Sequence, residues 1–237
     1  MSEVAIVTGG SGGIGQAVCK QLTEDGWHVI SIDVTPGPDI ENLTFFIGDI
    51  ADSKIWEIVA DYLLSRNLKL TSFLHFAFHL ERENFSKFAP GAWMRHFEVN
   101  VASVQTAVSI LGWDAFSERN ASMILASSVH SHLGIELHSG YAASKSALNA
   151  LARQLAVELA GSVRVNSLIL GPINTPVWDG ATAAQIESAK NQTASLRMGE
   201  PEDVADLVQF LVSSKASFIN GSEIVIDGGF LAKKETR

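Results

Sequence analysis

The stretch TGGSGGIG, residues 8–15, directly follows the apolar segment EVAIVT (3–8) and opens a helical pattern that begins near Ile14. Glycines at 9, 13 and 15 allow a tight turn in which backbone amides can approach a pyrophosphate at the positive end of the helix. Many glycine-rich turns bind nothing, so the prediction depends on the strand before this turn and the helix after it. The stretch predicts a strand-turn-helix unit that binds a dinucleotide.

Short segments rich in Val and Ile alternate with helical patterns along the rest of the chain. Their apolar runs are nearly continuous, as in strands buried on both faces of a parallel sheet. The sequence therefore predicts an α/β fold, a doubly wound parallel sheet with helices on both faces, in a single domain of residues 1–237. The predicted strands are 3–8, 27–33, 43–48, 70–77, 121–127, 163–170 and 223–227, the helices are roughly 14–25, 53–66, 92–112, 141–160 and 202–213, and 171–198 is a long irregular stretch.

Composition argues against several classes of partner. The 237 residues carry a formal net charge of −9 without a run of Lys or Arg, which disfavours nucleic acid and anionic membranes. The N-terminal apolar run is too short for a signal peptide or a membrane span, so we expect a cytoplasmic protein. Cys19 is the only cysteine, and no internal disulfide can form.

Asp33 ends the second predicted strand, about 20 residues after the glycine turn, where a carboxylate can accept hydrogen bonds from a ribose diol. The same charge would repel a 2′-phosphate, and no Arg or Lys lies in the turn or just after Asp33 to offset it. NAD is therefore favoured over NADP. The alternative role for Asp33 is to cap the transition from strand to turn.

Tyr141 and Lys145 lie one helical turn apart in YAASK (141–145), on one face of a predicted helix. An ammonium group near a phenol favours phenolate and lowers the pKa of the tyrosine, which suits acid and base catalysis. Such a Tyr-Lys pair is more often only a solvated surface pair. Ser128 supplies the context, because it ends a buried strand at the edge where open α/β sheets bind ligands, although a polar strand end is the alternative.

In this order and spacing, the glycine turn, Asp33, Ser128 and Tyr141-x-x-x-Lys145 resemble the short-chain dehydrogenase/reductase family. The resemblance covers essentially the whole chain and implies a Rossmann-like fold. It implies a catalytic set of Ser128, Tyr141, Lys145 and Asn100, no metal, and a cofactor-binding set of Gly9, Ser11, Gly12, Gly13, Ile14, Asp33, Asp49, Ile50, Ala77, Tyr141, Lys145, Ile173 and Thr175.

The resemblance also implies roles for the catalytic set. Tyr141 would exchange a proton with the oxygen of an alcohol or carbonyl while hydride passes to or from NAD, and Ser128 would orient that oxygen. Lys145 would hold the ribose of the nicotinamide half and lower the pKa of Tyr141. Asn100 would support a proton relay through water. The family further suggests a homotetramer.

Two segments depart from the family pattern. Where the family usually has Asn-Asn-Ala-Gly after the fourth strand, this chain has His75-Phe76-Ala77-Phe78, so the asparagine hydrogen bonds need substitutes. Phe78 either narrows the approach to the nicotinamide or turns into the core. Leu170 replaces a proline, and we expect only a modest local effect.

Four histidines, His79, His130, His132 and His138, lie on segments next to the predicted pocket. No Asp, Glu or Cys joins them at a spacing typical of metal ligands, so no metal is predicted. Histidines that line the pocket could bind an anionic or polyhydroxylated substrate when partly protonated, and solvated loop histidines are the alternative. Trp178 is a candidate contact from the irregular stretch.

Three functions follow from these patterns. The first is an NAD-dependent oxidoreductase for a small secondary alcohol or its ketone. The second is an NADP-preferring 3-oxoacyl-type reductase, against which Asp33 argues. The third is a non-catalytic dinucleotide-binding regulator, which the intact Ser, Tyr and Lys set disfavours.

Overall fold

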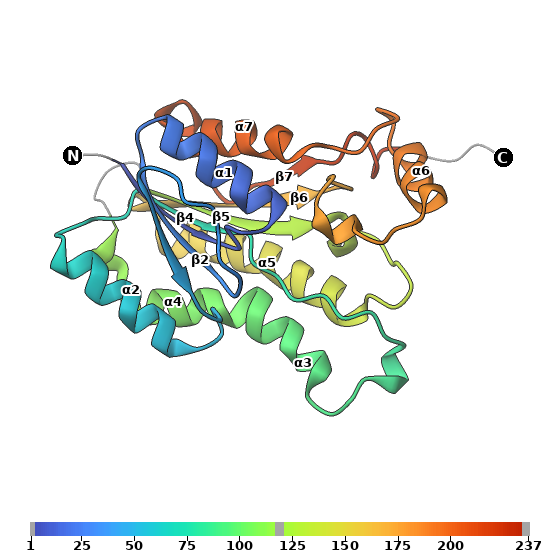
Figure 1. Ribbon diagram of the computed structural model, residues 1–237, viewed down its shortest axis with the longest axis horizontal. Helices are drawn as coiled ribbons and strands as arrows, with labels where there is room; N and C mark the ends of the chain where they lie inside the picture. Colours follow the sequence, from blue (N-terminus) through green and yellow to red (C-terminus); the bar gives the residue numbers. More distant parts are fainter. Residues whose placement is uncertain (1–2, 117–120, 234–237) are drawn as a thin grey trace.

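The structure, a computed structural model, describes residues 3–116 and 121–233 and contains one seven-stranded sheet (Figure 1). Its strand order is β3-β2-β1-β4-β5-β6-β7, and every neighbouring pair is parallel. The order reverses between β1 and β4, and open α/β sheets bind ligands at the carboxyl ends of the strands beside such a reversal. The strands are β1 Val4–Thr8, β2 His28–Asp33, β3 Leu43–Ile47, β4 Ser72–His75, β5 Ala121–Ser128, β6 Val163–Leu170 and β7 Glu223–Ile226.

Helices cover both faces of the sheet, which confirms the predicted doubly wound α/β fold. In Figure 1, α1 and α7 lie above the sheet, whereas α2, α4 and α5 lie below it. No helix in the described ranges is both long and apolar enough to cross a membrane. The α-helices are α1 Gly13–Glu24, α2 Ser53–Ser65, α3 Ala92–Phe97, α4 Ser103–Leu111, α5 Ser139–Glu158, α6 Ala183–Gln192 and α7 Pro201–Val212.

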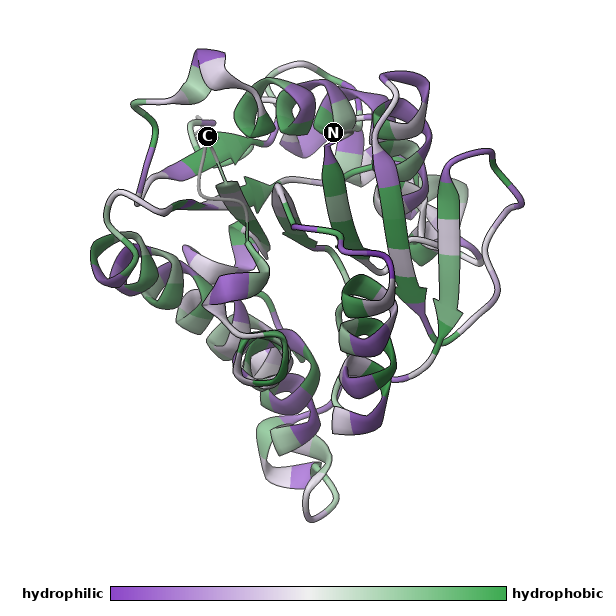
Figure 2. Cartoon of the chain, turned by 90° about the vertical axis from the view of Figure 1, so that its left-hand side faces the viewer, coloured by the Kyte–Doolittle hydropathy of each residue, from purple (hydrophilic) through white to green (hydrophobic). Residues whose placement is uncertain are grey.

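The core has two halves because successive side chains of a strand point to opposite faces of the sheet. Ile6 packs on the side of α2, α4 and α5, while its neighbour Val7 packs toward α1 and α7. Strands β1, β4 and β5 are buried at every position, as their continuous apolar runs predict. Figure 2 shows this distribution, with hydrophobic colours along the central strands and hydrophilic colours on the outer faces of helices.

Two parts of the predicted helix pattern are wrong in detail. The single helix expected over 92–112 is divided, because the π-helical segment η2 (Glu98–Ala102) separates α3 from α4. The stretch 171–198 is not irregular throughout, since it contains the short helix η5 (Pro176–Trp178) and all of α6. Thr182 and Gln185 form a capping box at the start of α6, a start signal that is visible in the sequence.

His75 supplies hydrogen bonds in the segment that departs from the family pattern. Its ring lies at the end of β4, with Nδ1 2.9 Å from the Thr8 hydroxyl and Nε2 3.1 Å from the backbone oxygen of Asn100. Because a carbonyl only accepts, Nε2 carries the proton and Nδ1 accepts from Thr8. His75 thus connects β1 and β4 to η2. Its burial, followed by the nearby charge of Lys145, lowers its pKa to about 3, so the ring is neutral at pH 7.

We predict that His75 makes stability fall in acid. The unfolded chain binds a proton at His75 below about pH 6.5, whereas the folded chain binds it only near pH 3. This contribution is therefore complete above pH 6.5 and is lost progressively as the pH falls toward 3. In urea unfolding between pH 4 and 6, His75→Gln should reduce the slope of unfolding free energy against pH by up to about 1.4 kcal/mol per pH unit. Identical slopes for the wild type and the variant would contradict this reading.

Candidate active site

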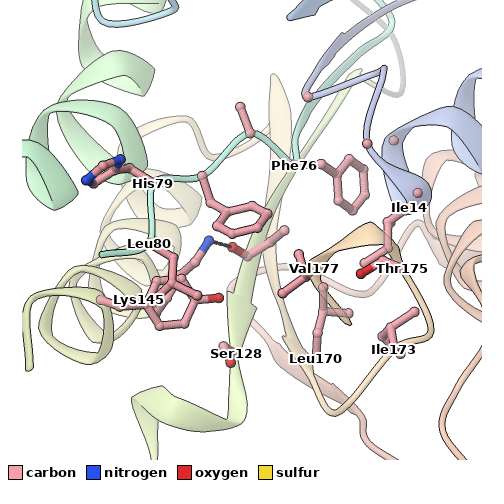
Figure 3. Close-up of a pocket in the computed structure, with 18 of the residues that line it drawn as sticks. Ile14, Phe76, His79, Leu80, Ser128, Lys145, Leu170, Ile173, Thr175 and Val177 are labelled. Carbon is pink, nitrogen blue, oxygen red and sulfur yellow. Dashed lines mark hydrogen bonds between the residues drawn. The ribbon is translucent and has the colours of Figure 1, made fainter. Parts of the chain in front are cut away.

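A cavity of about 650 Å³ lies at the carboxyl ends of the central strands. Figure 3 shows Lys145 and Leu80 on one side of it and Ile14 and Thr175 on the other. The structure thus brings most of the predicted site residues to one place. Those that line the cavity are Gly9, Gly12, Gly13, Ile14, Asp33, Asp49, Ile50, Ala77, Ser128, Tyr141, Lys145, Ile173 and Thr175, whereas Ser11 and Asn100 do not.

The glycine turn has no room for a side chain at Gly9 or at Gly15. Gly9 has a φ of +77°, and a Cβ on it would lie 2.6 Å from the backbone nitrogen of Ala77. A Cβ on Gly15 would lie 2.1 Å from the Gly9 oxygen. Helix α1 starts here without a side-chain cap and without an acidic residue in its first turn. Its exposed N–H groups and its dipole therefore fit a phosphate group.

Asp33 lies beside this turn and is held by it. One carboxylate oxygen accepts from the Ser11 backbone N–H at 3.0 Å, and the other accepts from the Thr35 backbone N–H at 3.2 Å. The residue thus caps the strand end, as the alternative reading expected, and also lines the cavity. A carboxylate has about four acceptor positions, so Asp33 keeps capacity for ligand hydroxyls. Ser11 does not line the cavity, and its backbone N–H holds the carboxylate of Asp33.

Asp49, after β3, is paired in a way that the sequence did not predict. One of its oxygens accepts from the Ala51 backbone N–H at 2.9 Å, and the other accepts from the guanidinium of Arg95 in α3. Arg95 also pairs with Glu98 at 3.2 Å and lines the cavity. No local motif marks Arg95, because its contact with Asp49 joins segments far apart in the sequence.

Lys145 fastens α5 to β5. Its Nζ donates to the backbone oxygen of Ala126 at 2.7 Å, and the hydroxyl of Ser127 donates to the backbone oxygen of Lys145 at 2.9 Å. The side chain is only 2% exposed, and its Nζ lies 5.5 Å from the ring centre of Tyr141. These bonds place the phenol of Tyr141, one turn earlier on α5, against the end of β5 where Ser128 lies.

The pKa values of this pair differ from the expectation that Lys145 lowers the pKa of Tyr141. Burial raises the pKa of Tyr141 to about 12, and a hydrogen bond with Ser128 partly opposes this rise. Burial also lowers the pKa of Lys145 to about 7. Both shifts have the same cause, since an apolar environment disfavours phenolate and ammonium alike. Lys145 alone therefore does not make Tyr141 a strong acid.

Ser128 is held by His130, which follows it in the short helix η4 (Val129–Ser131). The Ser128 Oγ accepts from the His130 backbone N–H at 3.3 Å and lies 3.0 Å from the Nδ1 of the same residue. The ring of His130 meets the ring of Tyr141 edge-on at 5.3 Å and lines the cavity. His132 does not line the cavity, and its Nε2 lies 3.1 Å from a carboxylate oxygen of Glu223.

Asn100 is fully buried behind the cavity wall. Its side-chain oxygen accepts from the His79 backbone N–H at 2.6 Å, and its amide nitrogen donates to the His79 oxygen and to the Ser144 hydroxyl. Its backbone oxygen accepts from His75. In this structure Asn100 therefore holds the segment after β4 in place.

Comparison with known proteins identifies the family. The family model described as enoyl-(acyl carrier protein) reductase matches residues 9–231, which is most of the chain. The chain belongs to the short-chain dehydrogenase/reductase family. As a member of this family, the protein is an oxidoreductase.

Individual relatives match over nearly their full length. A cyclopentanol dehydrogenase of Comamonas sp. is 29% identical, covering 97% of this chain and 97% of its own. An NAD-dependent glycerol dehydrogenase of Listeria innocua is 27% identical, covering 98% and 94%. The ligand-free aldohexose dehydrogenase of Thermoplasma acidophilum has the same fold, with a TM-score of 0.92 and 24% identity over 100% of this chain and 96% of its own.

The segment after β4 gives this cavity a bulkier side chain, Phe78, than the glycine that short-chain dehydrogenases usually have there. Phe78 faces the cavity, 42% exposed, and its ring meets the Tyr141 ring edge-on at 6.1 Å. It therefore narrows the pocket rather than filling the core. Leu170 and Trp178 line the same cavity, as do Arg82 and Arg95, which the sequence analysis did not single out.

Proposed function

We propose that this protein is an NAD-dependent dehydrogenase that transfers a hydride between the nicotinamide and a small secondary alcohol or its ketone, with Tyr141 as acid and base. The observation that carries the proposal is the meeting of Ser128, Tyr141 and Lys145 in the same cavity as the glycine turn and Asp33. The names of the cyclopentanol and glycerol dehydrogenases among the relatives support the substrate class.

Residues that line this cavity would hold the cofactor. The turn from Gly9 to Ile14 and the start of α1 would bind the pyrophosphate, and Asp33 would accept from the adenosine ribose. Ile173 and Thr175 would contact the nicotinamide half. When bound, the cofactor accepts or supplies the hydride, and its oxidised form places a positive charge near the phenol.

In alcohol oxidation, the phenolate form of Tyr141 would take the hydroxyl proton of the substrate while Ser128 would donate a hydrogen bond to the same oxygen. The Ser128 Oγ already accepts from the His130 backbone. If the Nδ1 of His130 also donates to it, both acceptor positions of the hydroxyl are filled and its own proton is free for the substrate. His130 is thus a positioning residue for Ser128. Ketone reduction runs these steps in reverse.

Tyr141→Phe tests the acid-base role. It removes the exchangeable proton and keeps the ring, so kcat should fall by roughly 10²- to 10⁴-fold while NAD binding is retained. The assay is NADH formation with a panel of small secondary alcohols, together with calorimetric titration of NAD. Tyr62→Phe is the matched control, since Tyr62 is the other tyrosine and packs near His28 and Thr44, away from the cavity. Near-normal turnover in Tyr141→Phe would overturn the proposed mechanism.

Cofactor choice tests Asp33. We expect kcat/KM for NAD to exceed that for NADP by on the order of 10²-fold, because the carboxylate repels a 2′-phosphate. Asp33→Ser should shrink this preference, mainly by improving NADP. Asp39→Ser, which removes the same charge from an exposed position in the next loop, should leave the preference unchanged. Equal use of the two cofactors by the wild type would refute the assignment of NAD.

A further inference from the structure

The end of the cavity near Tyr141 is rich in basic groups. Arg82, from the segment after β4, and His130 and His138, from the segment before α5, all line it. The carboxylates among the described lining residues are Asp33, the last residue of β2, and Asp49, which follows β3, both at the end proposed for the nucleotide. In a chain with a net charge of −9, this leaves one end of the cavity basic and without a carboxylate in its described wall.

His138 holds the guanidinium of Arg82. The Nδ1 of His138 lies 2.6 Å from the backbone oxygen of Glu136, so this nitrogen donates and carries the ring proton. Its Nε2 then accepts from the Nε of Arg82 at 3.2 Å. Among the described residues, the two terminal amino groups of Arg82 have no hydrogen-bond partner.

The acidic neighbours of Arg82 are directed elsewhere. Glu81 lies 3.9 Å from the Nε2 of His79, and a carboxylate oxygen of Glu83 accepts from the backbone N–H of Asn84. Neither forms an ion pair with Arg82 within 4.0 Å among the described residues. The guanidinium therefore keeps a planar pair of donors that fits a carboxylate.

A chain of contacts leads from Arg82 to the reacting groups. The rings of His138 and His130 lie 4.7 Å apart, and His130 contacts Ser128. The ring of His138 also lies 6.4 Å from that of Tyr141. Burial, followed by the nearby guanidinium of Arg82, lowers the pKa of His130 to about 4.

We propose that Arg82, held by His138, binds the carboxylate of the substrate, so that this enzyme acts on a short hydroxy acid or the corresponding oxo acid. The inference rests on the proposed function, because it needs Ser128 and Tyr141 to act on the carbinol of the same molecule. The guanidinium and the phenol ring both lie beside the imidazole of His138, so a short substrate would contact both groups. This arrangement selects against uncharged alcohols with the same skeleton.

The test compares each charged substrate with an uncharged substrate that has a matching carbon skeleton. NADH formation is measured with 3-hydroxybutanoate, 4-hydroxypentanoate, the methyl ester of each, and 2-butanol. For the wild type we expect kcat/KM for the better acid to exceed that for its ester by roughly 10- to 100-fold, as for a charge-assisted contact. Arg82→Gln should remove this preference through a higher KM for the acid. Arg66→Gln, which removes the same charge directly after α2 at a residue that does not line the cavity, should behave as the wild type.

Binding gives a second readout that does not depend on turnover. Butanoate should bind to the wild type loaded with NAD more tightly than butanamide does in calorimetry, and Arg82→Gln should abolish that difference. Equal kcat/KM for acids and esters, or a preference for the acid that survives in Arg82→Gln, would overturn the carboxylate site while the proposed dehydrogenase stands. Absence of NADH formation with every substrate, despite NAD binding, would instead overturn the proposed function, and butanoate binding would then decide the carboxylate site by itself.

Discussion

The contact between Lys145 and β5 determines the geometry of the site. Two hydrogen bonds, from the Lys145 ammonium to Ala126 and from Ser127 back to the Lys145 carbonyl, fix α5 against the strand that ends at Ser128. Since Tyr141 lies one turn earlier on the same helix, its phenol is fixed as well. Such preorganisation aligns the reacting groups before the substrate enters, which is a major source of catalytic rate. The sheet contributes the other half, because its parallel strands bring the glycine turn and Asp33 to the same edge.

The same contact imposes an electrostatic cost. Burial that gives precise placement also raises the pKa of Tyr141 to about 12 and lowers that of Lys145 to about 7. A further positive charge beside the phenol would favour phenolate. Oxidised nicotinamide carries such a charge, so under the proposed function the acidity of Tyr141 depends on NAD bound in the cavity. The ring of Phe78 also contacts the phenol ring on the cavity side.

The sequence predicted the sheet well because its signals are local. Continuous apolar runs identified all seven strands, and the glycine turn, Asp33, Ser128 and Tyr141-x-x-x-Lys145 lie at fixed spacings from strand ends. The single domain, the cytoplasmic location and the homotetramer stay predictions.

Other features depend on contacts between distant segments, which no spacing reveals. Arg95 reaches Asp49 across 46 positions, and His75 replaces lost asparagine bonds only because Thr8 and Asn100 meet its two ring nitrogens. The direction of the pKa shift at Tyr141 was also out of reach, because it depends on burial rather than on the lysine nearby in sequence. The helix α6 is different, since the capping box at Thr182 and Gln185 is a local signal from which the sequence could have predicted it.

The most direct measurement is the titration of Tyr141 with and without NAD. The chain has two tyrosines, so a protein labelled with ¹³C at tyrosine Cζ gives two signals, and Tyr62→Phe assigns the remaining one to Tyr141. We expect that the signal of the free protein stays that of the phenol to beyond pH 10, and that saturating NAD lowers the pKa of Tyr141 by at least about two units. An unchanged titration in a sample that saturates with NAD and oxidises its substrate would contradict the claim that the loaded cavity makes Tyr141 the acid and base.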